Sequence, residues 1–309
     1  MILFLSVALF ADALRVLNYF YKIFPVWVID NYSQVKTYYF IFVLFASFVI
    51  TYIGFRQYSK PQLKDLNLSI NSNKGQLDNL KIIAASDLHL GMIIQKSRLA
   101  EWIAMINKQD PDIILLVGDI FDRSLKPYDS QGLIDELKNL KSKYGVFAVL
   151  GNHDYYAKVD RSVDYLRRSG IKLLRDQSVI VDNRLMLIGR DDGTNRKRKP
   201  LKSLMSEIDP SFPVILMVHQ PTRLHESAKY NIDLQISGHT HNGQIFPGNL
   251  LAPRIWELSY GYREIDGTNF YVSSGLGLTY IPIRIGTRSE IVRIHLRSEN
   301  QVTSSSKFQ

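Results

Sequence analysis

A run of 19 residues without a charged side chain, from Thr37 to Phe55, most limits what this chain can fold into. A helix needs about 20 apolar residues to cross the hydrocarbon core of a bilayer, which is roughly 30 Å thick. Soluble helices of that length usually keep one polar face, and this run has none. Tyrosines lie near both of its ends, where aromatic rings favour the headgroup region. The run therefore predicts a membrane-spanning helix over about residues 37–55.

The segment before this run, residues 1–24, begins apolar and then acquires polar residues at helical spacing. Four of them would share one face of a helix: Asp12, Arg15, Asn18 and Lys22. This pattern predicts either a second membrane helix or an amphipathic helix at the membrane surface. A cleaved signal peptide is disfavoured, because no basic residue precedes the apolar start and a second hydrophobic segment follows. We assign residues 1–58 to a membrane-anchoring region.

The distribution of basic residues predicts the side of the membrane. Three basic residues follow the predicted span closely, Arg56, Lys60 and Lys64, while Lys22 and Lys36 precede it. Because basic residues favour the cytoplasmic side, we expect the rest of the chain to lie in the cytoplasm.

Charge and cysteine content exclude several classes of protein. The net charge of +9 divides into +3 over the first 60 residues and +6 spread over the rest. Such a diffuse excess lacks the dense basic surface of a nucleic-acid reader, so no nucleic acid is expected as a partner. The chain has no cysteine, which excludes disulfides, thiolate catalysis and cysteine-based metal sites.

Beyond the anchor, the sequence alternates short apolar runs with amphipathic stretches. Residues 59–79 are expected to form a linker and the first strand. Strands are then predicted at residues 80–86, 113–118 and 146–151, with helices at 97–108, 131–142 and 161–169. This β-α-β-α-β order predicts a parallel sheet with helices on its faces. Further strands are predicted as a hairpin at 179–189 and at 214–219, 234–239, 270–275 and 290–296, before a polar tail at 299–309.

Five short motifs carry most of the reactive side chains. They are SDLHLG (86–91), GDIFD (118–122), GNHD (151–154), VHQP (218–221) and GHTH (238–241). Each lies at the carboxyl end of a predicted strand, which is where α/β sheets bind ligands. Five of the seven histidines fall within them.

These motifs supply seven candidate metal ligands: Asp87, His89, Asp119, Asn152, His219, His239 and His241. Oxygen and nitrogen donors without thiolate suit Mn²⁺, Fe or Zn²⁺. Seven donors are too many for one ion and natural for two, and a buried cluster of this kind would be costly without metal. Paired ions about 3.5–4 Å apart stabilise the attacking and leaving oxygens of phosphoryl transfer. The sequence therefore predicts two divalent ions as cofactors.

With these motifs, the sequence resembles the calcineurin-like metallophosphoesterases, in their membrane-associated bacterial branch. The likeness runs from about Lys81 to Leu296 and includes YVSSGLG at 271–277 and a P-x-R-x-G-T-R-S-E stretch at 282–290. It implies an α/β fold, a β-sandwich flanked by helices in four α/β/β/α layers, over residues 80–298.

The resemblance also implies roles for the motif residues. One ion would be held by Asp87, His89 and His241. The other would be held by Asn152, His219 and His239, with Asp119 bridging the two. His153 would face the phosphate and leaving group, and Asp154 would orient His153 by accepting its other N–H. A metal-bridging hydroxide would attack phosphorus, without a phosphoenzyme. Asp122 is expected to play a structural or supporting role.

Residues near the motifs are candidates for substrate contacts. Arg190 and Tyr155 are expected to approach the substrate. The RKRK run at 196–199 fits either an anionic headgroup or diphosphate, or a solvated loop.

The leading hypothesis is a metal-dependent hydrolase of phosphoester bonds that acts on a membrane-associated or lipid-linked substrate. One alternative is the hydrolysis of a UDP-diacylglucosamine-type diphosphate in lipid A synthesis, which requires a cytoplasmic site. Another is a non-catalytic membrane scaffold, which the complete ligand set disfavours. The choice between monoester, diester and diphosphate stays open, as does the oligomeric state.

Overall fold

The computed structural model describes residues 2–70, 79–123 and 131–298. Part of the predicted linker, residues 71–78, and the predicted polar tail, 299–309, lie outside the described residues. The chain divides into two compact units, Met1–Arg56 and Gln57–Gln309.

The first unit is helical. Its elements are α1 (Ile2–Tyr21), α2 (Val26–Asp30) and most of α3 (Tyr32–Ser59). The ring of Phe4 meets that of Phe40 edge to face at 6.2 Å, and the Tyr39 hydroxyl donates to the Val7 carbonyl at 3.2 Å, so α1 and α3 pack together. Within the described part of the chain, α3 is the helix long and apolar enough to cross a membrane. It contains the predicted span.

The second unit contains two six-stranded sheets. The first has the order β1-β12-β2-β3-β4-β5. Its strands are β1 (Gln62–Ile70), β2 (Leu80–Ala85), β3 (Ile113–Val117), β4 (Val146–Val149), β5 (Lys172–Leu173) and β12 (Glu290–Ser298). Strands β2 to β5 are parallel, as the β-α-β-α-β pattern predicts. β12 joins β2 antiparallel and β1 parallel, so the final strand lies between the first two.

The second sheet has the order β10-β11-β9-β8-β7-β6. Its strands are β6 (Gln177–Val181), β7 (Leu185–Gly189), β8 (Val214–Met217), β9 (Leu234–Ser237), β10 (Gly261–Ile265) and β11 (Thr268–Val272). β6 and β7 form the predicted hairpin. β10 was not predicted from the sequence, because its GYREI sequence is largely exposed at the edge of the sheet and lacks an apolar run.

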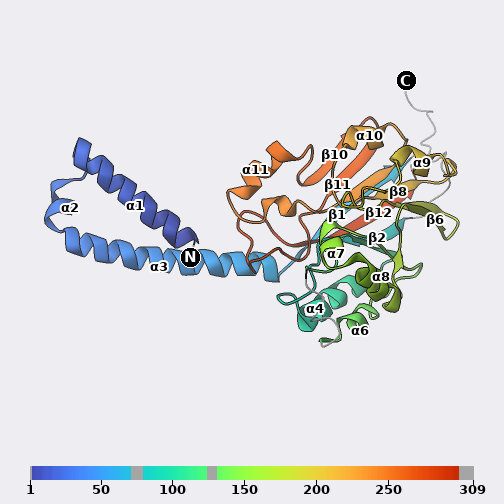
Figure 1. Cartoon of the computed structure of the whole chain (residues 1–309), viewed down its shortest axis with the longest axis horizontal. Helices are drawn as coiled ribbons and strands as arrows, with labels where there is room; N and C mark the ends of the chain where they lie inside the picture. The colour runs from blue at the N-terminus through green and yellow to red at the C-terminus, as the bar shows by residue number, and fades with distance from the viewer. Residues whose placement is uncertain (1, 71–78, 124–130, 299–309) are drawn as a thin grey trace, which may run out of the picture. The chain divides into compact units, whose positions relative to one another are not determined.

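Helices cover the outer faces of both sheets (Figure 1). α4 (Lys96–Asn107), α6 (Leu133–Leu137) and α8 (Val159–Arg168) pack on the first sheet, and α9 (Leu201–Met205) and α10 (Leu224–Ala228) pack on the second. Two further helices are α7 (Asn152–Tyr156) and α11 (Gly248–Ile255). α4 buries residues spaced three and four apart, including Leu99, Trp102 and Ile106. α6 is shorter than predicted, because the side chain of Asn107 bonds the backbone of Asn139 and Lys141 and holds that segment out of the helix.

Alternation along the strands places a core in each gap between layers. On β2, Ile83 packs beneath the helices α4 and α8, while Ile82 faces the second sheet. On β7, Leu187 faces the first sheet, while Met186 packs on the opposite side under α9. The four α/β/β/α layers predicted from the sequence are confirmed. This packing brings the carboxyl ends of β2, β3, β4, β8 and β9 together, each followed by a motif.

Candidate metal centre

Tight loops after the strands carry the candidate ligands. Five of these residues adopt left-handed backbone conformations, with φ between 47° and 72°: Asp87, His89, Asp119, His239 and His241. Left-handed conformations are costly for residues other than glycine, and such strain concentrates at functional sites. Each loop turns sharply, and this directs its side chain back over the end of the sheet.

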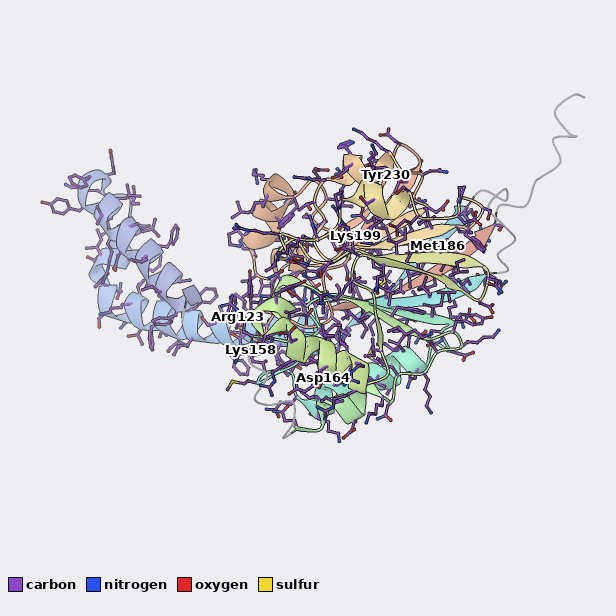
Figure 2. The ribbon with its side chains drawn as sticks, turned by 45° about the vertical axis from the view of Figure 1, so that its right-hand side comes forward. Arg123, Lys158, Asp164, Met186, Lys199 and Tyr230 are labelled. Carbon is purple, nitrogen blue, oxygen red and sulfur yellow. The ribbon has the colours of Figure 1, made fainter. Side chains whose placement is uncertain are left out.

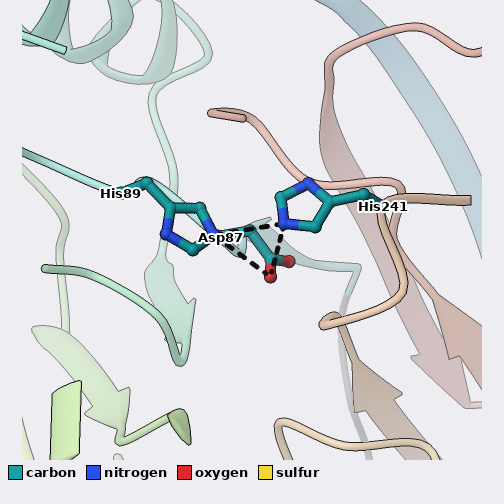
Figure 3. Close-up of side chains that lie close together, drawn as sticks. All are labelled: Asp87, His89 and His241. Atoms are coloured by element: carbon teal, nitrogen blue, oxygen red, sulfur yellow. Dashed lines mark hydrogen bonds and ion pairs between the residues drawn. The ribbon is translucent and has the colours of Figure 1, made fainter. Parts of the chain in front are cut away.

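The first cluster joins Asp87, His89 and His241, whose ligand atoms lie within 4.8 Å of one another (Figure 3). Nε2 of His89 and Nε2 of His241 are 3.1 Å apart. Oδ1 of Asp87 lies 4.0 Å from the first of these atoms and 3.5 Å from the second. All three residues are buried. The resemblance implies this same set of ligands for one ion.

The second cluster joins Asp119, His219 and His239, again within 4.8 Å. Oδ2 of Asp119 lies 3.2 Å from Nε2 of His219 and 3.8 Å from Nε2 of His89 in the first cluster. Its other oxygen accepts the backbone N–H of His153 at 2.8 Å. A single oxygen of Asp119 therefore faces both clusters.

Buried polar atoms in the two clusters indicate what kind of group the site could bind. Oδ1 of Asn152 is buried and has no hydrogen-bond partner among the described residues, and Nε2 of His219 is buried beside the carboxylate of Asp119. Nδ1 of His219 lies 2.8 Å from the Val117 carbonyl, which directs the opposite nitrogen into the site. An unpaired buried polar group costs about 1–3 kcal/mol, and a cation would satisfy these lone pairs. The residues present therefore fit divalent metal ions.

Burial lowers the pKa of three imidazoles in the site. It lowers the pKa of His89 and of His239 to about 4. The pKa of His241 is also held well below its ordinary value, by burial first and then by the charges of His89 and Arg284. These three rings are neutral at pH 7 and offer free lone pairs.

His219 behaves in the opposite way. Burial lowers its pKa, but the carboxylates of Asp119 and Asp87 outweigh burial and raise it to about 10. The pKa of Asp119 falls well below its usual range for the reciprocal reason: burial raises it, and His219 more than compensates. The two carboxylates thus stabilise positive charge between them, which is the charge that a metal ion supplies.

His153 lies beside the clusters, with its ring centroid 4.6 Å from that of His89. Its Nδ1 lies 3.4 Å from Oδ1 of Asp122. Asp154 does not make this contact. Its carboxylate accepts backbone N–H groups from Gly151 at 2.8 Å and from Phe121 at 2.9 Å. The orienting role expected of Asp154 is therefore corrected: these bonds turn its side chain away from His153, and Asp122 takes its place.

The sequence pattern does not predict a functional role for Arg284, although this residue lies in the P-x-R-x-G-T-R-S-E stretch. It is fully buried and donates from Nη2 to the carbonyls of Gly275 at 3.1 Å and Gly277 at 2.6 Å. The same nitrogen lies 3.3 Å from Nδ1 of His241. The one available signal was a charged residue between two isoleucines, in a run otherwise suited to burial.

The two predicted substrate contacts differ in their surroundings. The Tyr155 hydroxyl donates to Asp191 at 2.7 Å and accepts from Arg175 at 3.0 Å, so it is engaged within the protein. Arg190 is 7% exposed, and its guanidinium has no hydrogen bond or ion pair with any residue that the structure describes. Of the two side chains, that of Arg190 is therefore the less engaged within the described part of the protein.

Residues 80–243 match the protein family described as calcineurin-like phosphoesterase, and the chain belongs to this family. It is 33% identical over 250 residues to an uncharacterized metallophosphoesterase of Helicobacter pylori strain J99, covering 79% of this chain and 66% of that protein. It is 33% identical over 228 residues to one from Aquifex aeolicus, covering 71% and 86%. A transmembrane protein with metallophosphoesterase domain from Danio rerio is 32% identical over 253 residues, covering 77% and 57%. The chain thus spans slightly less than two thirds of the Helicobacter relative.

Proposed function

We propose that this protein hydrolyses phosphoester bonds with two divalent metal ions held by the seven predicted ligands. The observation that carries the proposal is the position of Asp119, whose Oδ2 faces a histidine of each cluster. When bound, two such ions acidify a water molecule and stabilise the oxygens of an in-line displacement. The donor set, which contains carboxylate, amide and imidazole but no thiolate, suits manganese, iron or zinc.

The residues around the clusters supply the remaining chemistry. His153 lies at the edge of the ligand set and donates a proton to the leaving oxygen. Burial disfavours its charged form, but the hydrogen bond to Asp122 and the charge of Asp119 outweigh burial and raise the pKa of His153. Asp122 therefore holds the imidazole in place and keeps a proton available on it.

The substrate is membrane-associated or lipid-linked, and the catalytic unit acts at the cytoplasmic face of a bacterial inner membrane. The support is the short connection to the anchor: α3, the candidate span, ends at Ser59 and β1 begins at Gln62. Such a connection tethers the catalytic unit to the candidate span by a short link. Basic residues after α3 favour the cytoplasmic side.

Arg190 favours a substrate with a second anionic group, such as a diphosphate. Its backbone N–H donates to the Met217 carbonyl at 3.0 Å, two residues before the ligand His219. Gln220, the residue after His219, donates from its side chain to Asp192 at 3.0 Å. This bond joins the loop after β8 to the loop after β7. Burial, followed by the nearby charge of Arg198, lowers the pKa of Arg190. An anion bound here would compensate a buried, unpaired guanidinium.

The test is an assay of the full chain in nanodiscs, reconstituted in turn with Mn²⁺, Fe²⁺, Zn²⁺ and Co²⁺. The substrates are a nitrophenyl phosphodiester, the corresponding monoester and then membrane lipid extracts. We expect turnover with at least one metal and its loss on chelation. Absence of turnover with every metal would contradict hydrolysis and leave a scaffold as the better reading.

A reporter fused to the carboxyl terminus tests the location. A reporter that is active only in the cytoplasm should be active, and one that requires export should be silent. The reverse result would place the catalytic unit outside.

A further inference from the structure

Large apolar side chains are exposed beside the metal centre, on two segments that we call the rim. The rim consists of Phe246, Leu250, Leu251, Ile255, Tyr280 and Ile281. Ile255 is 72% exposed and Tyr280 is 66% exposed. Exposed apolar residues gathered in this way mark interaction surfaces, because scattered single residues would be the ordinary case.

Hydrogen bonds join the two rim segments into one surface. The side chain of Gln244 donates to the carbonyls of Thr279 at 3.0 Å and Ile281 at 3.2 Å. The backbone N–H of Phe246 donates to the Ile285 carbonyl at 2.8 Å. The rim is therefore continuous from α11 to the loop before β12.

The rim borders the metal centre directly. The ligand His241 opens the short helix η2 (His241–Gly243), only a few residues before Phe246, and its Nε2 lies 3.1 Å from the Thr279 hydroxyl. The ring of Trp256, which follows α11, meets that of the ligand His239 at 5.0 Å. Whatever covers the rim therefore lies next to the candidate ligands His239 and His241.

The rim segments carry basic residues and no acidic ones. Residues 244–256 and 276–289 contain no aspartate or glutamate, whereas Arg254 and Arg288 are both exposed. Arg123, labelled in Figure 2, adds a further charge by donating from Nη2 to the Tyr280 hydroxyl at 2.6 Å. Apolar side chains flanked by basic ones suit the headgroup boundary of an anionic bilayer.

The chain enters the globular unit at one end of this same surface. The Gln57 carbonyl accepts the backbone N–H of Ser289 at 3.2 Å, and the Lys60 carbonyl accepts from Nε of Arg288 at 3.4 Å. Gln57 lies in the last turn of α3, the candidate span, and Lys60 directly follows that helix. The end of α3 is thus bonded to the segment that carries Tyr280 and Ile281.

We propose that the rim inserts into the surface of an anionic bilayer, so that the metal centre receives phosphoester lipids directly from the leaflet. The lipid substrate rests on the proposed function, whereas insertion of the rim does not. Insertion buries the exposed side chains of α11 and the Tyr280 loop, and Arg254 and Arg288 meet the lipid phosphates. A substrate headgroup then reaches the metals while its acyl chains stay in the membrane.

The absence of cysteine from the chain allows a direct test. Single variants Leu251→Cys and Ile255→Cys receive an environment-sensitive fluorophore in the full chain, in nanodiscs with and without anionic lipid. Ile180→Cys is the matched control, because Ile180 is 43% exposed on β6, the edge strand at the far side of the second sheet from β10 and α11. We expect blue-shifted emission and quenching by lipid-borne quenchers at both rim positions, stronger with anionic lipid, and neither effect at the control. Rim labels as exposed to water as the control would overturn the proposal.

A second comparison measures function. The double variant Leu251→Glu with Ile255→Glu should lose at least about 10-fold in hydrolysis of a fluorogenic phosphodiester lipid within vesicles, and keep its rate on a soluble nitrophenyl phosphodiester. Ile180→Glu should change neither rate. Equal losses on both substrates, or no loss on the lipid, would contradict the proposal. The fluorophore result does not depend on catalysis, so failure of membrane insertion and failure of the hydrolase assignment are distinguishable.

Discussion

Oδ1 of Asp122 lies 3.4 Å from Nδ1 of His153, at the edge of a buried set of metal ligands. Carboxylate–histidine contacts fix the orientation of an imidazole and the position of its proton. Asp154, only one residue from His153 in sequence, bonds the backbone instead. The two carboxylates therefore have separable effects, one on catalysis and one on folding.

Replacement of Asp122 by Asn should lower kcat about 10- to 100-fold on substrates with poor leaving groups, because His153 loses its orienting partner. The loss should be smaller on nitrophenyl esters, whose leaving group needs little protonation. Steady-state kinetics across a series of leaving groups measures this difference, with metal content as the control. A loss that is independent of the leaving group would show that Asp122 acts in another way.

Replacement of Asp154 by Ala should destabilise the protein by about 3 kcal/mol, because it leaves buried backbone N–H groups of Gly151 and Phe121 without an acceptor. Urea unfolding of the full chain in detergent measures the change, with Asp122→Asn as the comparison. Equal stability of the two variants would mean that these bonds contribute little.

The strands that carry the motifs can be predicted from the sequence because each is built mainly of apolar residues, as in IILLV of β3. The sequence could not predict the orientation of Asp154, since neighbouring carboxylates in GDIFD and GNHD have the same chemistry. The three-dimensional fold determines which of the two carboxylates contacts His153. The role of Arg284 could not be predicted for a similar reason. Its carbonyl partners Gly275 and Gly277 belong to a loop whose path the sequence pattern does not determine.

Replacement of Gly151 by Ala should abolish metal binding, because a Cβ atom there would lie 2.2 Å from Oδ1 of Asp119 and 2.4 Å from its backbone nitrogen. Gly193 provides the control, since its nearest neighbour would be 3.7 Å away. Metal analysis and turnover of Gly151→Ala and Gly193→Ala make the comparison. A fully active Gly151→Ala protein would show that Asp119 can shift without loss of the site.

Replacement of Arg190 by Met should raise KM at least about 10-fold more for a diphosphate substrate than for a single phosphodiester, because the second anion loses its contact. Arg190→Lys should recover part of the difference. Arg167→Met, on the exposed face of α8, controls for net charge. Equal changes in KM for both substrates would show that Arg190 does not contact a second anionic group.

The proposed function depends on Asp119 bridging two metal ions. The most direct measurement is the metal content of the reconstituted full chain by mass spectrometry, taken together with turnover, for the wild-type protein and Asp119→Ala. We expect two ions per wild-type chain, and at most one ion and no turnover in Asp119→Ala. Two ions or full turnover in Asp119→Ala would contradict it.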